Sequence, residues 1–506
     1  MTIARLSQTA ALVTVFGATG AQADLTAALV WEDMSDLITS FGYQMEADQD
    51  FDADGLTLTN MTITSLPFDP DAEAVTIDFG TVRMTENADG SVSIEWPETV
   101  PLSIRGTGAD DIPFEVEFLI DQTAASQLVS GTPDTLTYDY AAETIDVRLV
   151  DVTEDGATLS EDVVSVSLGL AAVSGTTVSR PGDVHLYERT ASADSVVYAL
   201  SFADPEEGGA FSLAGRNDDI RIESSGELPQ GLDLENLDPE FFLNTAAAGL
   251  MSHGGGAMEL DLVDEDGQTV AVESRSSGAA VDVLLGPDGI NYDFTFLDSN
   301  VLMSVPDLPF PISFAMASSG GLFQLPLRAS DDPQPFGFGL ALRDVVVSDS
   351  VWNLFDPGAL LPRDPADMVL NLSGTATLLT DFFETEMTSP EDDLDLDLNT
   401  LDINELVLSL AGARLTGDGA FVFDPDKPSP FGNFPSPVGK LNIALSGANG
   451  LLDTLVAMGF VPEDQAMGAR MMMGLLAIPG TQPDTMTSMI ELNDQGHVLA
   501  NGQRIQ

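Results

Sequence analysis

Residues 50–55, DFDADG, place carboxylates at alternating positions before a glycine, which is the spacing of the first half of a calcium-binding loop. Asp50, Asp52 and Asp54 would supply the oxygen ligands that Ca²⁺ prefers. The twelfth position of such a loop is Met61 instead of a bidentate glutamate, and the segment leads into the alternation of a strand. We therefore predict a hairpin turn here and keep a loosely bound calcium ion as the alternative.

Catalytic and transition-metal sites have little support in the sequence. Residues 252–256, SHGGG, are similar to the oxyanion-hole loop of esterases, but the chain contains no Gly-x-Ser-x-Gly elbow. His185, His253 and His497 lie far apart and there is no cysteine, so neither a zinc nor an iron site is expected. We expect the glycines at 254–256 to end a helix, and we predict a protein that is not an enzyme.

Residues 351–374, VWNLFDPGALLPRDPADMVLNLSG, place Arg363 between two Asp-Pro steps in a chain with only 17 Lys and Arg. We expect Ser350 to cap a short apolar helix and the Pro-Gly step at 357–358 to end it. Arg363 is expected to pair with a neighbouring carboxylate, that of Asp356, Asp364 or Asp367. The structural interpretation is an apolar plug at the end of a sheet. The functional alternative is a partner-docking loop formed by Trp352, Phe355, Asp356, Pro357, Arg363, Asp364 and Pro365.

The elements that carry these residues are predicted to be mostly strands, because apolar positions alternate along most of the chain. Val92, Ile94 and Trp96 show the period of two, as do many later segments. Asp-Gly steps, which favour hairpin turns, occur at 54–55, 89–90, 155–156, 266–267, 288–289 and 418–419. We therefore predict a mainly β (α+β) and elongated fold, with large twisted, mostly antiparallel sheets and a few short capping helices.

Helical spacing of apolar residues predicts helices at 24–41, 450–458 and 462–477. A further helix is expected to begin at Asp238, with Pro239 in its first turn, and to end at 254–256. Residues 393–400, DLDLDLNT, are expected to form a strand with one acidic face, made by Asp393, Asp395 and Asp397. On the last helix we expect flexible methionines to fill the core, namely Met467, Met471, Met472 and Met473.

These elements suggest four segments. Residues 1–23 read as a secretory signal peptide, with one positive charge, a short apolar stretch and an Ala-Gln-Ala cleavage pattern. An N-terminal helix and a β-rich domain are expected at 24–236, and a helix with β hairpins at 237–330. A β-rich C-terminal domain at 331–506 would hold the plug and two late helices. The signal peptide predicts a periplasmic protein, with secretion as the alternative.

The net charge of −65, from 82 acidic and 17 basic residues, restricts the partners. It repels nucleic acids and anionic headgroups, so we expect no nucleic acid partner. The absence of cysteine excludes disulfides, and therefore packing must stabilise the fold. Beyond the signal peptide no apolar stretch approaches the roughly 20 residues of a transmembrane helix, so we expect no membrane span in the mature chain.

Residues 340–378, LALRDVVVSDSVWNLFDPGALLPRDPADMVLNLSGTATL, resemble bacterial exported proteins of the family called domain of unknown function 2125. DLTAALVWEDM after the signal peptide and DTLTYDY at 134–140 support this resemblance. It implies an envelope protein with no assigned reaction and no catalytic residues to transfer. Residues 401–424 and 496–505, GHVLANGQRI, more weakly resemble AsmA-like envelope proteins, whose long curved sheets have an apolar inner face that can hold lipid chains.

Together these observations predict a non-enzymatic envelope protein without a resident cofactor. We expect it to bind an apolar ligand such as lipid, or an envelope partner, in a groove lined by alternating strand faces. The alternative is an acidic structural or surface protein that assembles through calcium. A closed sandwich that buried every apolar strand face would contradict the groove.

Overall fold

The computed structural model describes residues 24–65, 75–107, 112–160, 162–204, 208–229, 245–287, 289–382, 396–424 and 436–506. Several predicted features lie outside these residues. They are the signal peptide at 1–23, the helix start at Asp238 and Pro239, the Asp-Gly step at 288, and Asp393 and Asp395 of the acidic strand.

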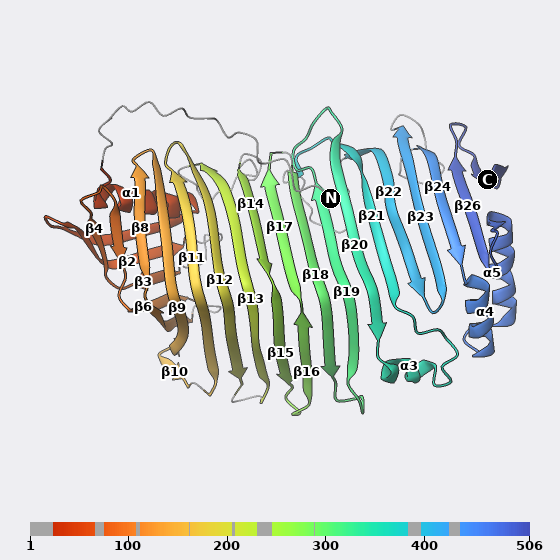
Figure 1. The fold of residues 1–506 in the computed structure, drawn as a ribbon, viewed down its shortest axis with the longest axis horizontal. Helices are drawn as coiled ribbons and strands as arrows, with labels where there is room; N and C mark the ends of the chain where they lie inside the picture. Colours follow the sequence, from red (N-terminus) through yellow and green to blue (C-terminus); the bar gives the residue numbers. More distant parts are fainter. Residues whose placement is uncertain are drawn as a thin grey trace.

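The described residues form one antiparallel sheet of 28 strands, which lie side by side along the long axis of the molecule (Figure 1). The prediction of a mainly β, elongated, antiparallel fold is therefore confirmed. The first strands are β1 (Tyr43–Phe51), β2 (Gly55–Ser65), β3 (Thr76–Phe79), β4 (Val82–Glu86), β5 (Val92–Glu95), β6 (Thr99–Thr107), β7 (Pro113–Thr123), β8 (Ser126–Thr132), β9 (Thr135–Glu154), β10 (Ala157–Leu159), β11 (Val164–Arg180), β12 (Val184–Ala203) and β13 (Ala210–Pro229).

The sheet continues without a break into the C-terminal part of the described chain. Its later strands are β14 (Ala246–His253), β15 (Gly255–Val263), β16 (Thr269–Ser276), β17 (Gly278–Gly286), β18 (Gly289–Ser304), β19 (Ile312–Leu325), β20 (Gln334–Val347), β21 (Ala366–Leu378), β22 (Leu396–Leu410), β23 (Ala413–Asp424), β24 (Ser436–Ser446), β25 (Ile478–Pro479), β26 (Thr485–Leu492), β27 (Val498–Ala500) and β28 (Gln503–Arg504).

In the residues that the structure describes, four helices accompany the sheet: α1 (Ala27–Ser40), α3 (Asp349–Phe355), α4 (Ala448–Ala457) and α5 (Glu463–Leu476). All four begin within three residues of a start that the sequence predicts. The Thr26 hydroxyl caps α1 by accepting from the Leu29 N–H at 3.3 Å. The cap position of α3 is Ser348, so the prediction of Ser350 is wrong by two residues. Within the described ranges, no helix is long and apolar enough to cross a membrane.

The helix expected to end at 254–256 is wrong over its described residues. Two strands, β14 and β15, occupy this region, and Gly254 lies between them. The Ala-rich segment favours a helix locally, but β13 and β17 hydrogen-bond β14 on both sides, and this pairing overrides the propensity. The Asp-Gly step at 418–419 also lies inside β23 instead of in a turn. The steps at 54–55, 89–90, 155–156 and 266–267 connect strands as predicted.

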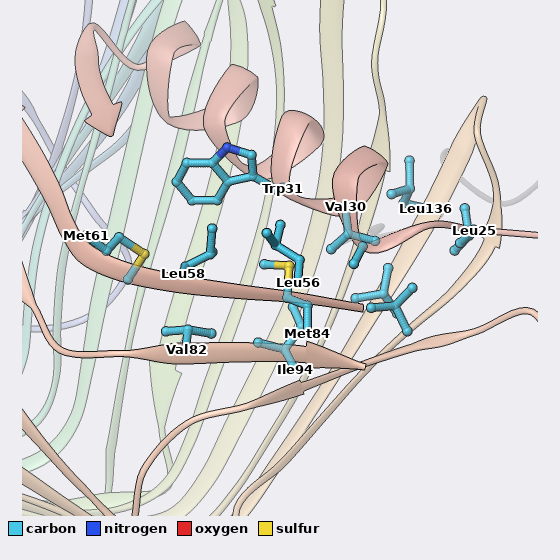
Figure 2. Close-up of a cluster of buried hydrophobic side chains, with 13 residues drawn as sticks. Leu25, Val30, Trp31, Leu56, Leu58, Met61, Val82, Met84, Ile94 and Leu136 are labelled. Carbon is cyan, nitrogen blue, oxygen red and sulfur yellow. The ribbon is translucent and has the colours of Figure 1, made fainter. Parts of the chain in front are cut away.

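Helix α1 covers the N-terminal end of one face of the sheet. Figure 2 shows Val30 and Trp31 of this helix above apolar side chains of β2, β4 and β5. Val30 is fully buried, as are Leu56 and Leu58 of β2. This cluster is the largest group of fully buried side chains in the described residues, and it fixes α1 on the sheet by hydrophobic burial.

The cluster shows how the sheet keeps its apolar side chains on one face. Leu58 and Met61 both belong to it, although strict alternation along β2 would direct an even and an odd position to opposite faces. Asn60 lies between them with a φ of 51°, and it acts as an extra residue in the strand. The partner strand β1 is irregular opposite this point, between Glu46 and Asp48.

In other strands, too, the apolar residues change between even and odd positions, and the points of change form a row that crosses the sheet. In β13 the apolar residues are odd-numbered before Asp219, at Phe211 and Leu213, and even-numbered after it, at Ile220 and Ile222. Because side chains alternate, one extra residue per strand keeps these positions on the same face without changing the pairing between strands. We call this row the crease; it comprises Glu143, Ala172, Asp194, Asp219, Gly254, Ser277, Asp298, Ala317 and Asp344.

Four crease residues have a left-handed backbone. The φ angles are 51° at Ala172, 53° at Asp219, 46° at Asp298 and 52° at Asp344. Aspartate tolerates this region better than most residues because its short polar side chain bonds locally. The recurring aspartates are therefore explained by backbone geometry, and they need no ligand.

Candidate binding face

One face of the sheet is apolar over most of its length. Directly paired residues of neighbouring strands share a face, so rows of pairs show what each face carries. On one side of the crease, a row of seven successive strands is entirely apolar: Val166, Leu200, Leu213, Leu260, Val272, Met303 and Ile312.

Beyond the crease the apolar rows continue to the C-terminal end of the sheet. Tyr292 pairs with Phe323, which pairs with Phe338, which pairs with Leu372. A longer row runs from β13 to β24 and is made of Ile222, Met251, Val281, Phe294, Gly321, Leu340, Leu370, Leu406, Gly417 and Ile443. We call the surface formed by these rows the apolar face.

The opposite face carries the charge. Asp282 pairs directly with Asp293, and Glu259 with Glu273, all from rows that alternate with the apolar ones. Cross-strand serines also meet on this face, with the Ser174 and Ser192 hydroxyls 3.0 Å apart. Like charges directly opposite one another destabilise a sheet, so their tolerance here indicates a face that is well solvated.

The middle of the apolar face is open. Met251, Phe323 and Phe338 are 55%, 44% and 43% exposed. The Phe294 ring lies so close over Gly321 that a Cβ atom there would come within 2.5 Å of it. Since the strands hydrogen-bond their backbone groups within the plane of the sheet, this face presents hydrocarbon and ring surface with few groups that need a polar partner.

Helices close both ends of the apolar face. At the N-terminal end α1 covers it, as described above. At the other end the Ser488 hydroxyl of β26 donates to the Leu476 carbonyl of α5 at 2.5 Å, and Ser488 shares its face with Ile443. The sheet is therefore an open, single layer with capped ends, and it is not a closed sandwich.

A hollow of about 350 Å³ lies between β3, β6 and β7. Phe79, Leu102 and Phe118 line it, and these three residues pair in succession across the strands. Its volume is within the range of small-molecule sites, roughly 300–1,000 Å³. A larger hollow of about 440 Å³ lies on the charged face, where Asp139, Thr176 and other polar residues line it.

The segment around Trp352 packs as a plug. Trp352 and Leu361 are buried with Ala411, and the side chains of Leu451 and Leu455 from α4 pack on them. Asp356 is 1% exposed and accepts hydrogen bonds from the Leu360 and Leu361 N–H groups, both at 2.9 Å. The Leu360 N–H holds the pKa of Asp356 below its usual range.

Arg363 does not use the expected carboxylates. Its guanidinium pairs with Asp349 and donates to the Asn353 side chain at 2.9 Å and to the Asp356 carbonyl at 3.1 Å. It also lies over the Trp352 ring, 5.8 Å from the centroid. The helix α3 brings Asp349 close, which sequence proximity alone did not indicate. Asp367 pairs instead with Arg414 at 2.8 Å.

Of the other proposed docking residues, Phe355 is 42% exposed and packs on Trp352 with ring centroids 5.2 Å apart. Pro357, Asp364 and Pro365 lie on the connection from α3 to β21 and are exposed or half-buried. These contacts agree with the structural interpretation of a plug. The docking role of the segment stays a prediction.

The predicted calcium residues lie at the β1–β2 turn. Asp52 accepts from the Asp54 and Gly55 N–H groups and pairs with Arg83 at 2.8 Å. The hydrogen bond from Arg83 lowers the pKa of Asp52 to about 2. Asp50 is an exposed residue within β1. Over the described ranges, no three His, Cys, Asp or Glu residues are grouped so that they could hold a metal ion.

A buried polar cluster, missed by the sequence reasoning, links α1 to three strands. Asp33 of α1 accepts from the Tyr138 hydroxyl at 2.6 Å and from the Ser179 hydroxyl at 2.8 Å. The Ser179 oxygen is also 2.6 Å from Nε2 of His185. Since Ser179 gives its only proton to Asp33, His185 must donate through Nε2, and its Nδ1 has no partner in the described residues.

This cluster is not arranged for nucleophilic catalysis. Ser179 and His185 are both 0% exposed, and Asp33 holds the serine instead of orienting the histidine. Burial and the Asp33 carboxylate raise the pKa of Tyr138, which stays a hydrogen-bond donor. The only sequence signal for the cluster is a lone aspartate on the apolar side of an amphipathic helix.

We expect the attachment of α1 to weaken in acid. Burial lowers the pKa of His185, against the opposing influence of Asp33 and Asp36. The unfolded chain takes up this proton near pH 6.5, whereas the folded state resists it, so stability falls as pH drops through that value. Hydrogen exchange of α1, measured from pH 7.5 to 5.5, should show that its free energy of opening falls by up to about 1.4 kcal/mol per pH unit. If the free energy of opening fell equally with pH in His185→Gln, the pH dependence could not be assigned to His185.

No protein-family model matches the chain, and no curated protein matches its sequence.

Proposed function

We propose that this protein is a non-enzymatic exported envelope protein that binds the hydrocarbon chains of lipids on its apolar face. The observation that carries the proposal is the continuity of that face. Apolar rows pass from strand to strand on both sides of the crease, while the charged rows lie on the opposite face of the sheet. Monomeric proteins rarely expose so large an apolar surface unless it binds something.

The dimensions of the apolar face favour extended hydrocarbon as the ligand. Strands lie about 4.8 Å apart, so the stretch from β9 to β26 spans roughly 60 Å, about twice the 30 Å hydrocarbon thickness of a bilayer. Several acyl chains could lie along it in series. A compact small molecule would occupy only a small part of such a surface.

The chemistry of the apolar face supports the same ligand. Its exposed side chains in the middle of the sheet are aromatic or aliphatic, as at Ile222, Tyr292 and Met368. Burying such surface with hydrocarbon contributes roughly 25 cal/mol per Å². The net charge of −65 disfavours anionic headgroups, so we propose neutral or zwitterionic lipids. The resemblance to AsmA-like sheets is consistent with this choice.

The test is to purify the mature protein from its native envelope without detergent, extract it with organic solvent, and identify bound lipid by mass spectrometry. Phe323→Asp places a charge in the middle of the apolar face, where bound hydrocarbon would desolvate it. We expect at least a tenfold loss of co-purifying lipid. Folded wild-type protein that carries no lipid would overturn the proposal.

Leu284→Asp is the matched control for Phe323→Asp. Leu284 is 51% exposed, close to the 44% of Phe323, but it pairs with Asn291 on the charged face. We expect this variant to retain its lipid. If both variants lost lipid equally, the loss would reflect damage to the sheet and would not locate the ligand.

A further inference from the structure

The outer side of α5 is the most exposed apolar surface of any described helix. Met467, Met471, Met472 and Leu475 are 61%, 72%, 56% and 59% exposed. We call these four residues the α5 stripe. The prediction that these methionines fill the core is therefore wrong for three of the four, and Met473 is half-buried. The helical spacing was correct, but the sequence could not show which side of the helix faces the sheet.

No polar side chain interrupts this surface. From Met467 to Gly480, every exposed residue is apolar or glycine. Arg470 is turned towards α4, where it pairs with Asp453 at 2.5 Å. The only exposed acidic groups of α5, Glu463 and Asp464, lie in its first turn. A contiguous exposed apolar patch of this kind indicates an interaction site.

The patch extends beyond the α5 stripe. Phe460, in the connection from α4, is 54% exposed, and Ile478, just after α5, is 53% exposed. The C-terminal end of α5 is fixed, because the Leu476 carbonyl accepts from both the Ser488 hydroxyl and the Asn501 side chain at 2.9 Å. Helix α5, which carries the stripe, is therefore held at the C-terminal end of the sheet (Figure 1).

We infer that the α5 stripe inserts into the surface of a neutral or zwitterionic lipid bilayer. Helices with one apolar side bind in the plane of a membrane with that side about 5–10 Å deep. Methionine and leucine side chains are flexible and adapt to fluid acyl chains. The acidic first turn would stay in water while the α5 stripe enters the bilayer.

Charge selects the kind of bilayer. Interfacial helices that bind anionic membranes carry lysine and arginine on their polar side. Here α5 has one arginine, already paired, and the whole chain is strongly acidic. We therefore exclude anionic membranes as the preferred surface. This inference does not depend on lipid carriage by the sheet.

The test is co-flotation of the full chain with phosphatidylcholine vesicles on a density gradient. We expect the wild type to float and the double variant Met471→Asp, Leu475→Asp to lose at least tenfold of its vesicle binding. Both positions are solvent-exposed, so the variant should fold, and hydrogen exchange of α4 and α5 would check this. Val422→Asp, at a residue 60% exposed in β23, is the matched control and should float normally.

Three outcomes would overturn the inference. They are a wild type that stays unbound, a double variant that floats as well as the wild type, and binding that requires anionic lipid. If the wild type stays unbound and is an oligomer, whereas the double variant is a monomer, the α5 stripe would be assigned to contact with a second copy of the chain. Phe323→Asp separates this inference from the proposed function, because it should lose co-purified lipid and still float.

Discussion

Deletion of Asp219 alone is expected to destabilise the middle of the sheet by about 5 kcal/mol. The deletion removes the extra residue of β13 at the crease, so the residues that follow move to the opposite face. Arg221 and Glu223 would enter the apolar face, while Ile222 would enter the charged one. The pairs that residues 220–229 make with β12 and β14 would be mismatched, at about 0.2–1 kcal/mol each.

Asp219→Gly is the control for this deletion. It keeps the residue count and supplies the amino acid that adopts a φ of 53° most easily, so we expect unchanged or slightly higher stability. Thermal unfolding followed by circular dichroism, with hydrogen exchange of β12 to β14, would measure both variants. A deletion that unfolds like the wild type would show that the crease does not set the faces of the strands.

Leu58→Ala is expected to cost 2–5 kcal/mol, and the damage should remain at the N-terminal end of the molecule. Leu58 is fully buried under α1, in a cluster that repacks only in part when atoms are removed (Figure 2). In an elongated sheet each strand contacts mainly its neighbours, so stability is local, as in repeat proteins. Hydrogen exchange should rise in α1, β2 and β4, and remain unchanged from β21 to β26.

Leu58→Met serves as the conservative control, because a swap of similar volume usually costs less than about 1.5 kcal/mol. If Leu58→Ala raised exchange equally along the whole sheet, the molecule would unfold as one cooperative unit. That result would contradict the local picture and would require a long-range contact between the two ends.

Most of the fold could be predicted from the sequence. Period-two alternation and Asp-Gly turns indicate antiparallel strands because they depend only on neighbouring residues. Helices α1, α4 and α5 follow from apolar spacing in the same way. The failure at β14 has a physical cause: an alanine-rich segment has helical propensity, but two flanking strands hydrogen-bond it over its whole length.

The candidate site was less predictable. The plug around Trp352 was anticipated, whereas the pairing of Arg363 with Asp349 depends on how α3 folds back. The apolar face left a signal that could have been used, since the numbering of apolar residues changes from odd to even at Asp219 and from even to odd at Asp298. The polar cluster left only the aspartate on the apolar side of α1 as a signal, because its partners Tyr138, Ser179 and His185 are distant in sequence.

The sequence by itself determined the charge, the strand periodicity and the helices, because these depend on composition and on residues a few positions apart. Only the tertiary structure decided that the sheet is one open layer, that one face is apolar along its length, and that α5 turns its methionines outward. These properties depend on which strands pair and on which side each helix packs. Pairing between distant residues is set by the whole chain, and local patterns do not encode it.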